Sequence, residues 1–370
     1  GGACYKALIV PAVKLIPVST LKKLVALARQ GATVVFVEHY PEDVPGYASL
    51  KQNREQLFAL LEQLPGEKSF QGTQTFNFGK GRIIVGSDYH EALERTGVPA
   101  EELKTRWGAQ FIRRTHTEGH HYFISDLQAN DVEGWVTLNV PEKHIMCFDP
   151  MTGKRGIAKT REVEGKTQVY MQLKSGESII LQTFTRSLQG EPEWKYRKEM
   201  DYSLSLDHGW KLRFVESYPA IEGEFKIDTP SSWTEVAHPA AKINRGTALY
   251  SLELDLPELS ADDWVLDLGD VRESARVRIN GQEAGIAWAA PFRLSIGQLL
   301  KPGKNLIEVE VTNLPANSIA EMDRQGKQWR IFEDINMAKL NYEKGTYGHW
   351  ETLPSGLNGI VRLIPVKYLF

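Results

Sequence analysis

The sequence has little cysteine, little net charge and no long apolar run. Its 370 residues contain two cysteines, Cys4 and Cys147, so at most one disulfide can form, and this count does not decide the redox compartment. Lys and Arg total 44 against 47 Asp and Glu, a net charge of −3, which argues against an electrostatic nucleic-acid binder. No apolar run approaches the ~18 residues of a membrane span. Because the chain starts with neither an initiator Met nor a signal-type segment, we expect it to begin inside a longer polypeptide.

The length and composition are those of a globular protein with more than one domain. At about 150 residues per domain, the length predicts two or three domains. Hydrophobic residues make up 42% and charged residues 25%, which excludes a disordered tail or a collagen-like fibre. Nine Trp and thirteen Tyr are the more informative excess.

Residues 1–106 are predicted to form a small α/β domain. The apolar run Leu8-Ile9-Val10, stopped by Pro11, is typical of a strand buried on both faces of a parallel sheet. Parallel strands are also expected at 32–37 and 82–85, and helices at 21–28 and 50–64, the first capped by Ser19-Thr20 and closed by Gly31. No nucleophile elbow and no phosphate-binding glycine loop follows a strand, which predicts a structural role.

Residues 107–186 change to a period of two and predict a small antiparallel β-sandwich. Strands are expected at 111–117, 120–127, 135–140, 145–148, 167–173 and 178–184, with a tight turn at Glu118-Gly119. His116, His120 and His121 flank that turn. No Cys, Asp or Glu completes a zinc-ligand spacing, and adjacent residues of a strand point to opposite faces, so surface histidines are favoured over a metal site.

Residues 187–370 begin with a polar connector, 187–198, and continue as a series of strands that predicts a jelly-roll sandwich. Strands are expected at 210–215, 223–227, 248–256, 264–268, 274–279, 283–288, 292–296, 305–311 and 359–365. Asn280-Gly281 is the strongest hairpin signal, since both central positions of a type I′ turn need positive φ.

Several motifs of this last region resemble the sugar-binding jelly-roll domain of family 2 glycoside hydrolases. They are Arg245-Gly246-Thr247-Ala248-Leu249-Tyr250, Leu266-Asp267-Leu268-Gly269, Ala275-Arg276-Val277-Arg278-Ile279-Asn280-Gly281, Gly285-Ile286-Ala287-Trp288-Ala289-Ala290-Pro291-Phe292 and Pro302-Gly303-Lys304-Asn305-Leu306-Ile307-Glu308-Val309. Val311-Thr312-Asn313-Leu314-Pro315-Ala316-Asn317 and the segment 350–363 look more like the C-terminal region of large bacterial glycoside hydrolases of the α-L-rhamnosidase type. Residues 5–11 and 21–37 are similar to the small α/β domain of those enzymes, and Tyr122-Phe123-Ile124 with Phe148-Asp149-Pro150-Met151-Thr152-Gly153 to the β-domain after it.

The resemblance implies a multi-domain α/β plus all-β fold. Its parts would be a flavodoxin- or amidotransferase-like α/β domain at 1–106, a β-sandwich at 107–186 and a galactose-binding-like jelly roll at 187–370. In those families catalysis belongs to a TIM barrel, which lies upstream in the rhamnosidase type. No run of eight βα units occurs in this chain, and its length leaves no space for the ~250 residues of a barrel. The carboxylate pair of glycoside hydrolysis is therefore expected elsewhere, and no catalytic residue is nominated here.

Candidate sugar contacts are aromatic residues with planar polar neighbours, because pyranose rings stack on aromatic faces. The first is Trp288, at the end of a hairpin strand, which could equally plug the sandwich end. The others lie in the long excursion 314–354, whose residues Glu321, Asp323, Arg324, Trp329, Arg330, Tyr342, Tyr347, His349, Trp350 and Glu351 are unlike a flexible linker.

From that excursion we select Trp329, Arg330, Trp350 and Glu351 as carbohydrate-binding candidates. Trp350-Glu351 followed by Ser355-Gly356 resembles the family 2 segment that leans toward the barrel's active site, although there the acidic residue precedes the tryptophan. The alternative is that the excursion packs on the barrel. No cofactor is expected, and a structural calcium at Asp262-Asp263 is a less favoured option than solvated loop acids.

The functional hypothesis is a C-terminal, non-catalytic fragment of a bacterial glycoside hydrolase that acts on plant or bacterial polysaccharide and is inactive alone. Its partners would be an oligo- or polysaccharide and the catalytic barrel upstream in the same polypeptide, with no nucleic acid and no membrane span, in the periplasm or outside the cell. The alternative is a free-standing carbohydrate-binding protein. The residues do not choose the glycan, the retaining or inverting course, or the oligomeric state.

Overall fold

The chain folds into two compact units that are rich in β-structure. The computed structural model describes residues 5–66, 72–256, 258, 260–330 and 345–370. One unit comprises Gly1–Trp107 with Thr137–Pro141 and Glu164–Thr167, and the other comprises Gly108–Val136, Glu142–Val163 and Gln168–Phe370. Among the described residues, no helix combines the length and apolarity that a membrane crossing requires.

The first unit contains a four-stranded sheet in the order β1-β2-β4-β3. Strands β1, β2 and β4 are parallel to one another, as expected from their apolar runs, whereas β3 is antiparallel to β4. Strand β3 was not predicted, because only its two Phe residues are apolar and most of its side chains are exposed. The strands are β1 (Leu8–Val10), β2 (Thr33–Val37), β3 (Gln74–Phe78) and β4 (Gly81–Gly86).

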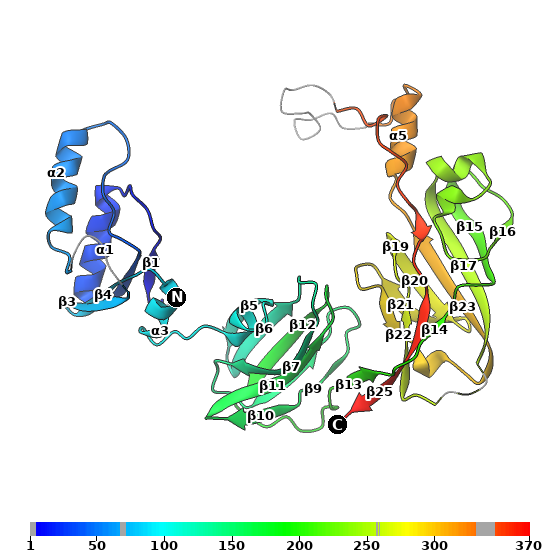
Figure 1. The fold of residues 1–370 in the computed structure, drawn as a ribbon, viewed down its shortest axis with the longest axis horizontal. Coiled ribbons are helices and arrows are strands. Elements are labelled where there is room, and N and C mark those ends of the chain that lie inside the picture. The colour runs from blue at the N-terminus through cyan, green and yellow to red at the C-terminus, as the bar shows by residue number, and fades with distance from the viewer. Residues whose placement is uncertain (1–4, 67–71, 257, 259, 331–344) are drawn as a thin grey trace. The chain divides into compact units, whose positions relative to one another are not determined.

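Helices cover both faces of this sheet (Figure 1). The helices are α1 (Val18–Gln30), α2 (Leu50–Leu61), α3 (Tyr89–Glu94) and α4 (Glu102–Thr105). Phe36 and Val85 pack with α1 and α2 on one face, and Val35 and Ile84 pack with Ala92 of α3 on the other. The prediction of burial on both faces is confirmed for β2 and β4. It is wrong for β1, which lies at the edge of the sheet and leaves Ile9 46% exposed.

The predicted cap of α1 is wrong. The N-cap residue is Pro17, which has no side-chain cap, and its carbonyl accepts hydrogen bonds from the backbone N–H groups of Thr20 and Leu21. Ser19 and Thr20 are therefore inside the helix. Proline is compatible with this position because its fixed φ suits a helix start.

The second unit begins with two sheets. A five-stranded antiparallel sheet has the order β5-β6-β12-β8-β9, and a three-stranded sheet has the order β10-β11-β7. Each strand expected at 111–184 has a counterpart, which confirms β-sandwich content. The strands are β5 (Gln110–His116), β6 (Gly119–Ser125), β7 (Val132–Leu138), β8 (His144–Phe148), β9 (Arg155–Ile157), β10 (Thr160–Val163), β11 (Lys166–Leu173) and β12 (Ser178–Phe184).

The hairpin turn in this region lies one residue earlier than predicted. His116 pairs with Gly119, so the turn residues are Thr117 and Glu118, and Gly119 is the first residue of β6. A Cβ at Gly119 would collide with the backbone of Thr183. The glycine is therefore required for a close approach to β12 and not for the turn itself.

The remainder of the second unit is a larger β-sandwich whose two sheets share one core. One sheet has the order β13-β25-β18-β22, with β14 also paired to β25, and the other has the order β16-β15-β17-β23-β20-β21. Leu266 and Leu363 of the first sheet pack with Leu212, Tyr250 and Val309 of the second. The strands of this region are β13 (Tyr196–Glu199), β14 (Leu204–Ser205), β15 (Trp210–Tyr218), β16 (Glu224–Ile227), β17 (Arg245–Leu256), β18 (Asp263–Asp267), β19 (Val271–Arg272), β20 (Ser274–Ile279), β21 (Gln282–Ala287), β22 (Arg293–Ser295), β23 (Gly303–Thr312), β24 (Gly356–Leu357) and β25 (Arg362–Leu369), and the short helices are η1 (Trp233–Glu235), η2 (Pro239–Ile243) and η3 (Gly297–Leu299).

The turn at Asn280-Gly281 joins β20 to β21 as predicted. Ile279 pairs with Gln282, and φ is 53° at Asn280 and 78° at Gly281, so both central residues of this two-residue turn have the positive φ of a type I′ turn. The Asn280 side chain also donates to the Leu299 carbonyl and to Asn305 Oδ1, both at 2.9 Å. The turn is thereby tied to the rest of the sheet.

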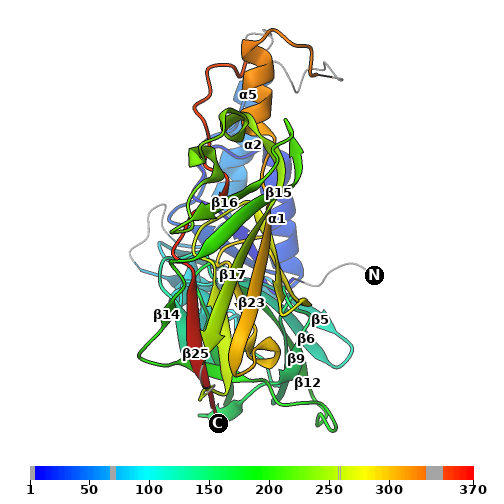
Figure 2. The same ribbon diagram turned by 90° about the vertical axis from the view of Figure 1, so that its right-hand side faces the viewer.

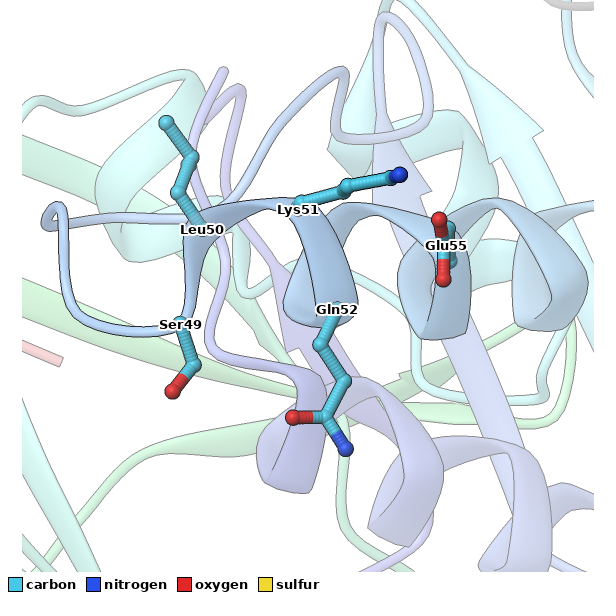
Figure 3. Close-up of a pocket in the computed structure, with 5 residues that line it drawn as sticks. All are labelled: Ser49, Leu50, Lys51, Gln52 and Glu55. Atoms are coloured by element: carbon cyan, nitrogen blue, oxygen red, sulfur yellow. The ribbon is translucent and has the colours of Figure 1, made fainter.

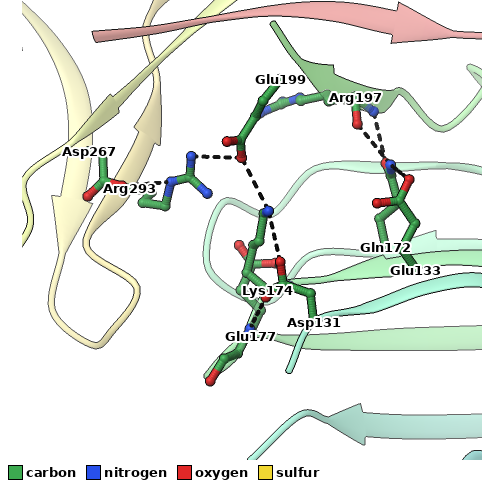
Figure 4. A network of polar contacts seen from close by, with 10 residues as sticks. Asp131, Glu133, Gln172, Lys174, Glu177, Arg197, Glu199, Asp267 and Arg293 are labelled. Atoms are coloured by element: carbon green, nitrogen blue, oxygen red, sulfur yellow. Dashed lines mark hydrogen bonds and ion pairs between the residues drawn. The ribbon is translucent and has the colours of Figure 1, made fainter. Parts of the chain in front are cut away.

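A row of alternating charges joins the first sandwich of this unit to the second (Figure 4). Lys174 Nζ lies 2.9 Å from Asp131 Oδ2 and 3.3 Å from Glu199 Oε1. Arg293 continues the row, with its guanidinium 2.9 Å from Glu199 and 3.3 Å from Asp267. Burial raises the pKa of Glu199, but Arg293 and Lys174 outweigh it and hold that pKa below the usual range.

Aromatic side chains reinforce this junction. The ring centroids of Tyr170 and Tyr196 are 5.2 Å apart, and Phe370 lies 5.4 Å from Tyr170. Tyr196 belongs to β13 and is 3% exposed. The segment 187–198, expected as a polar connector, therefore contributes a buried residue and a strand.

Candidate functional site

A helix that the sequence did not predict begins the excursion 314–354. Helix α5 (Ala316–Arg324) follows Pro315 and stands beyond one end of the larger sandwich, as Figures 1 and 2 both show. Its buried residues are Asn317, Ser318 and Ala320. Because two of these are polar and the third is small, the segment lacks the apolar stripe by which a helix is recognised.

Polar contacts tie the returning chain to α5. Asn317 Oδ1 accepts from the backbone N–H of Leu353, and Asn317 Nδ2 donates to the Leu353 carbonyl, both at 2.8 Å. Arg324 donates to the carbonyls of Gly348 and Trp350 at 2.9 Å and 3.0 Å. These bonds hold residues 348–353 alongside the helix.

Below this segment, Ser355 fastens the chain to the sandwich. Its hydroxyl accepts from Asn313 Nδ2 at 3.0 Å, and its backbone N–H donates to Ser232 Oγ at 2.9 Å. Ser232, Asn317 and Ser355 are all buried. Buried polar groups must be paired to be tolerated, so this polar seam fixes the base of α5 to the sandwich.

Three aromatic rings gather at the far end of α5. Tyr347 lies between the other two rings, 5.7 Å from Trp329 and 4.5 Å from Trp350, measured between centroids. The Arg330 guanidinium lies over the rings of Trp329 and Tyr347 at 4.9 Å and 5.2 Å. Such cation–π contacts fix both the rings and the charge.

Asp323 holds this arrangement together. Its Oδ1 accepts from Trp329 Nε1 at 2.7 Å, and its Oδ2 accepts from the backbone N–H of Tyr347. The backbone bond from Tyr347, followed by the bond from Trp329, lowers the pKa of Asp323 below its usual range. We call Asp323, Arg324, Trp329, Arg330, Tyr347 and Trp350 the α5 cluster.

The structure brings three of the five nominated residues into this cluster and leaves two outside it. Trp329, Arg330 and Trp350 belong to the cluster, and Trp350 is 39% exposed. Glu351 is next to Trp350 and exposed, and its side chain forms no hydrogen bond or ion pair with a described residue. Trp288 follows β21 on the edge of the six-stranded sheet and is 62% exposed. Tyr342, which the sequence also suggested, lies outside the described residues.

The acids considered for calcium make protein contacts. Asp263 accepts from the backbone N–H groups of Trp264 and Gly297 and from the Ser295 hydroxyl, and Asp262 accepts from the backbone N–H of Tyr368. Within the described ranges, no group of three or more His, Cys, Asp or Glu residues is placed to hold a metal. We therefore assign no cation to these acids.

The histidines beside the β5–β6 turn form ordinary side-chain contacts. His120 Nδ1 lies 3.2 Å from Glu142 Oε2, while the His121 ring lies 4.4 Å from the ring of His116, tilted by 42° to it. His120 and His121 thus have different partners, as adjacent residues of a strand should.

A surface hollow of about 480 Å³ lies at the start of α2 (Figure 3). Its lining residues are Ser49, Leu50, Lys51, Gln52 and Glu55, which come from one short stretch of chain. In the close-up their side chains point in different directions and do not converge. We therefore do not consider this hollow a candidate binding or catalytic site.

Three comparisons with known proteins bear on the chain. Residues 1–160 match the family model described as alpha-L-rhamnosidase. A protein of Formosa agariphila that carries the provisional name beta-glucuronidase is 29% identical over 197 residues, which are 48% of this chain and 17% of that protein. The solved structure of a rhamnosidase from Novosphingobium sp. PP1Y superposes with a TM-score of 0.66 at 25% identity, over 95% of this chain and 32% of that one.

The chain thus spans a third or less of the length of these relatives. The match to the rhamnosidase extends over both units described above, and the family model covers the first unit and the beginning of the second. The resemblance expected from the sequence motifs is therefore confirmed. This chain is similar, over nearly all of its length, to a region of a rhamnosidase-type glycoside hydrolase.

Proposed function

We propose that this chain is an accessory, non-catalytic region of a larger bacterial glycoside hydrolase of the rhamnosidase type. The observation that carries this proposal is the match to the Novosphingobium rhamnosidase, which includes 95% of this chain but only 32% of that protein. The chemistry would then belong to a barrel upstream in the same polypeptide. A bacterial enzyme that degrades plant or bacterial polysaccharide meets its substrate in the periplasm or outside the cell, which is where we place it.

The parts of the chain would serve as scaffold and as carbohydrate contact. In this proposal residues 1–106 are a flavodoxin-like support domain, 107–186 a small β-sandwich and 187–370 a galactose-binding-like jelly roll. The three-layer packing around β1, β2 and β4 and the shared core of the two larger sheets support these assignments.

The α5 cluster is the proposed point of contact with saccharide. Its rings are held in fixed positions by Asp323 and Arg330, and preorganised aromatic faces bind sugar rings with little loss of conformational entropy. Trp350 remains partly exposed, and the exposed carboxylate of Glu351 beside it could accept hydrogen bonds from sugar hydroxyls. Packing of the cluster on the barrel is the competing role.

Hydrolysis assays test the non-catalytic part of the proposal. The purified 370-residue chain should release no nitrophenol from p-nitrophenyl α-L-rhamnopyranoside or from the matching β-glucuronide. Turnover that survives purification and disappears when a single carboxylate of this chain is changed to its amide would refute it.

Binding measurements test the role of the α5 cluster. Tryptophan fluorescence should respond to added rhamnose-containing oligosaccharides, and Trp350→Ala should weaken the binding at least about fivefold, in line with ~1 kcal/mol or more per stacked ring. Tyr47→Ala is the control, because Tyr47 is 92% exposed and lies in the other unit. Equal affinities for the two variants would assign the cluster to packing rather than to saccharide.

A further inference from the structure

The six-stranded sheet of the larger sandwich carries a second surface with binding chemistry. A hollow of about 310 Å³ lies on the face of this sheet that is turned away from the core, across β15, β17, β23, β20 and β21. Glu216, Thr247, Arg276, Ile286, Glu310 and Thr312 are among its lining residues. Their neighbours along the strands, such as Ala248, Ala275 and Val311, are buried in the core, as strand alternation requires.

The strand register places the polar groups of this hollow in rows. Glu216 pairs with Thr247 and Thr247 with Thr312, and the two threonine hydroxyls are 2.8 Å apart. In the next row Arg276 stands opposite Glu310 on one side and Ile286 on the other. Donors and acceptors from four strands therefore converge on one place.

Two of these groups have unused hydrogen-bonding capacity. Glu310 is engaged by Arg278, whose guanidinium lies 2.6 Å from Glu310 Oε1. No ion pair or side-chain hydrogen bond joins Arg276 or Glu216 to any described residue. A free guanidinium and a free carboxylate on either side of two hydroxyls can donate to and accept from neighbouring sugar hydroxyls.

An exposed tryptophan, Trp288, follows the strand that contributes Ile286 to the hollow. It follows Ile286 by two residues at the end of the edge strand β21. Ile286 and Trp288 are 42% and 62% exposed, while Ala287 between them is 2% exposed and belongs to the core. Continued one residue past β21, this alternation predicts the Trp288 side chain on the same side of the sheet as Ile286, which lines the hollow.

We propose that the outer-sheet hollow and Trp288 form a binding site for one pyranose unit of a neutral saccharide. Arg276 carries a positive charge and Glu216 a negative charge, while Glu310 is neutralised by its ion pair with Arg278. The site therefore has no net charge that would favour an acidic sugar. Its volume is near the lower end of the ~300–1,000 Å³ typical of ligand pockets, which suits a single ring. This proposal extends the accessory role stated above and rests on it.

Ligand-observed saturation-transfer NMR and calorimetry on the 370-residue chain test the site. The probes are L-rhamnose, D-galactose and D-galacturonate. At least one neutral sugar should bind, and Arg276→Gln and Trp288→Ala should each weaken its binding about tenfold, as expected for the loss of a charge-assisted hydrogen bond or an aromatic platform. Tighter binding of galacturonate than of both neutral sugars would refute the proposal that the site selects neutral saccharides.

Two matched controls lie outside both proposed binding surfaces. Arg213→Gln removes a guanidinium from the same sheet outside the hollow, and Tyr47→Ala removes an exposed aromatic ring from the other unit. Both should leave binding at the hollow unchanged, and thermal unfolding of every variant should match the parent within a few degrees.

Two results of the binding experiments would refute the proposed site. Binding that is lost in Trp350→Ala and kept in Arg276→Gln would refute the site while preserving the accessory function. Absence of binding by both neutral sugars would also refute it, and would favour coverage of this face by another domain. The hydrolysis assay reports on the accessory function independently of all these results.

Discussion

Replacing Asn317 with alanine should loosen the segment that carries Trp350. The Asn317 side chain is 5% exposed and makes two 2.8 Å hydrogen bonds to the backbone of Leu353. At about 1 kcal/mol for each hydrogen bond, Asn317→Ala should lower the free energy of unfolding by ~2 kcal/mol. The better helix propensity of alanine returns roughly 0.5 kcal/mol. The expected loss of unfolding free energy is therefore about 1.5 kcal/mol.

Hydrogen exchange gives the sharper readout, because the change is local. The backbone N–H of Tyr347 is bonded to Asp323, and that of Trp350 to the Tyr347 carbonyl. If Asn317 holds the segment, both amides should exchange about tenfold faster in the variant, which corresponds to ~1.4 kcal/mol in the opening equilibrium. Urea unfolding of the same protein measures the global free energy.

Gln325→Ala is the matched control. It also removes a carboxamide near α5, but among the described residues the amide of Gln325 bonds to the partly exposed carboxylate of Glu321 in the preceding turn and to no other side chain. Its cost should stay below about 0.5 kcal/mol. Unchanged exchange at Tyr347 and Trp350 in Asn317→Ala, or an equal effect of the two variants, would refute the argument that the polar seam positions the cluster.

Three further predictions concern the rest of the second unit. Arg293→Met should lower the unfolding free energy by about 1–2 kcal/mol, less than for a fully buried pair because Glu199 and Asp267 are partly exposed, and the cost should shrink in 1 M salt; a salt-independent cost would contradict the ionic account. Burial raises the pKa of the free Cys147 thiol, so in a Cys4→Ser background Ellman's reagent should react only after unfolding in urea, and fast labelling of the native protein would contradict this. Burial, and after it the neighbouring His116, lowers the pKa of His121, which also faces Arg114 and Gln182 across the strands. The native state therefore binds a proton at His121 less readily than the unfolded state does. Because the unfolded state takes up that proton first, the free energy of unfolding decreases as the pH falls below about 6.5. Urea unfolding at pH 8 and pH 5 should therefore show a smaller acid loss in His121→Gln than in the parent, and equal losses would exclude His121 as the cause.

Elements with a strong apolar signal were predictable from the sequence. The buried runs of β2 and β4 and the stripe of α1 specify their elements locally, and Asn280-Gly281 specifies its turn through φ alone. Elements held by polar contacts were not predictable. The buried face of α5 consists of Asn317, Ser318 and Ala320, and its partner Leu353 is 36 residues away in sequence.

The candidate sites were likewise predictable only in part from the sequence. Composition was sufficient to draw attention to Trp329, Arg330 and Trp350, because aromatic residues are rare in a flexible linker. It could not show that Asp323 joins Trp329 to Tyr347, since that contact depends on the fold of α5. The outer-sheet hollow depends on the register of five strands, which no local pattern specifies.

The two proposed surfaces differ in what they leave free for a ligand. In the α5 cluster the polar atoms serve the protein: both oxygens of Asp323 accept internal hydrogen bonds, and Arg324 donates to Glu321 and to two carbonyls. What remains outward there is aromatic surface, which binds most pyranoses similarly because each has an apolar face. The outer-sheet hollow instead keeps Arg276 and Glu216 free, and hydrogen bonds to particular hydroxyls discriminate strongly between sugars that differ in one group. Affinity at the cluster should therefore vary little among neutral sugars, whereas affinity at the hollow should depend on the position of each hydroxyl.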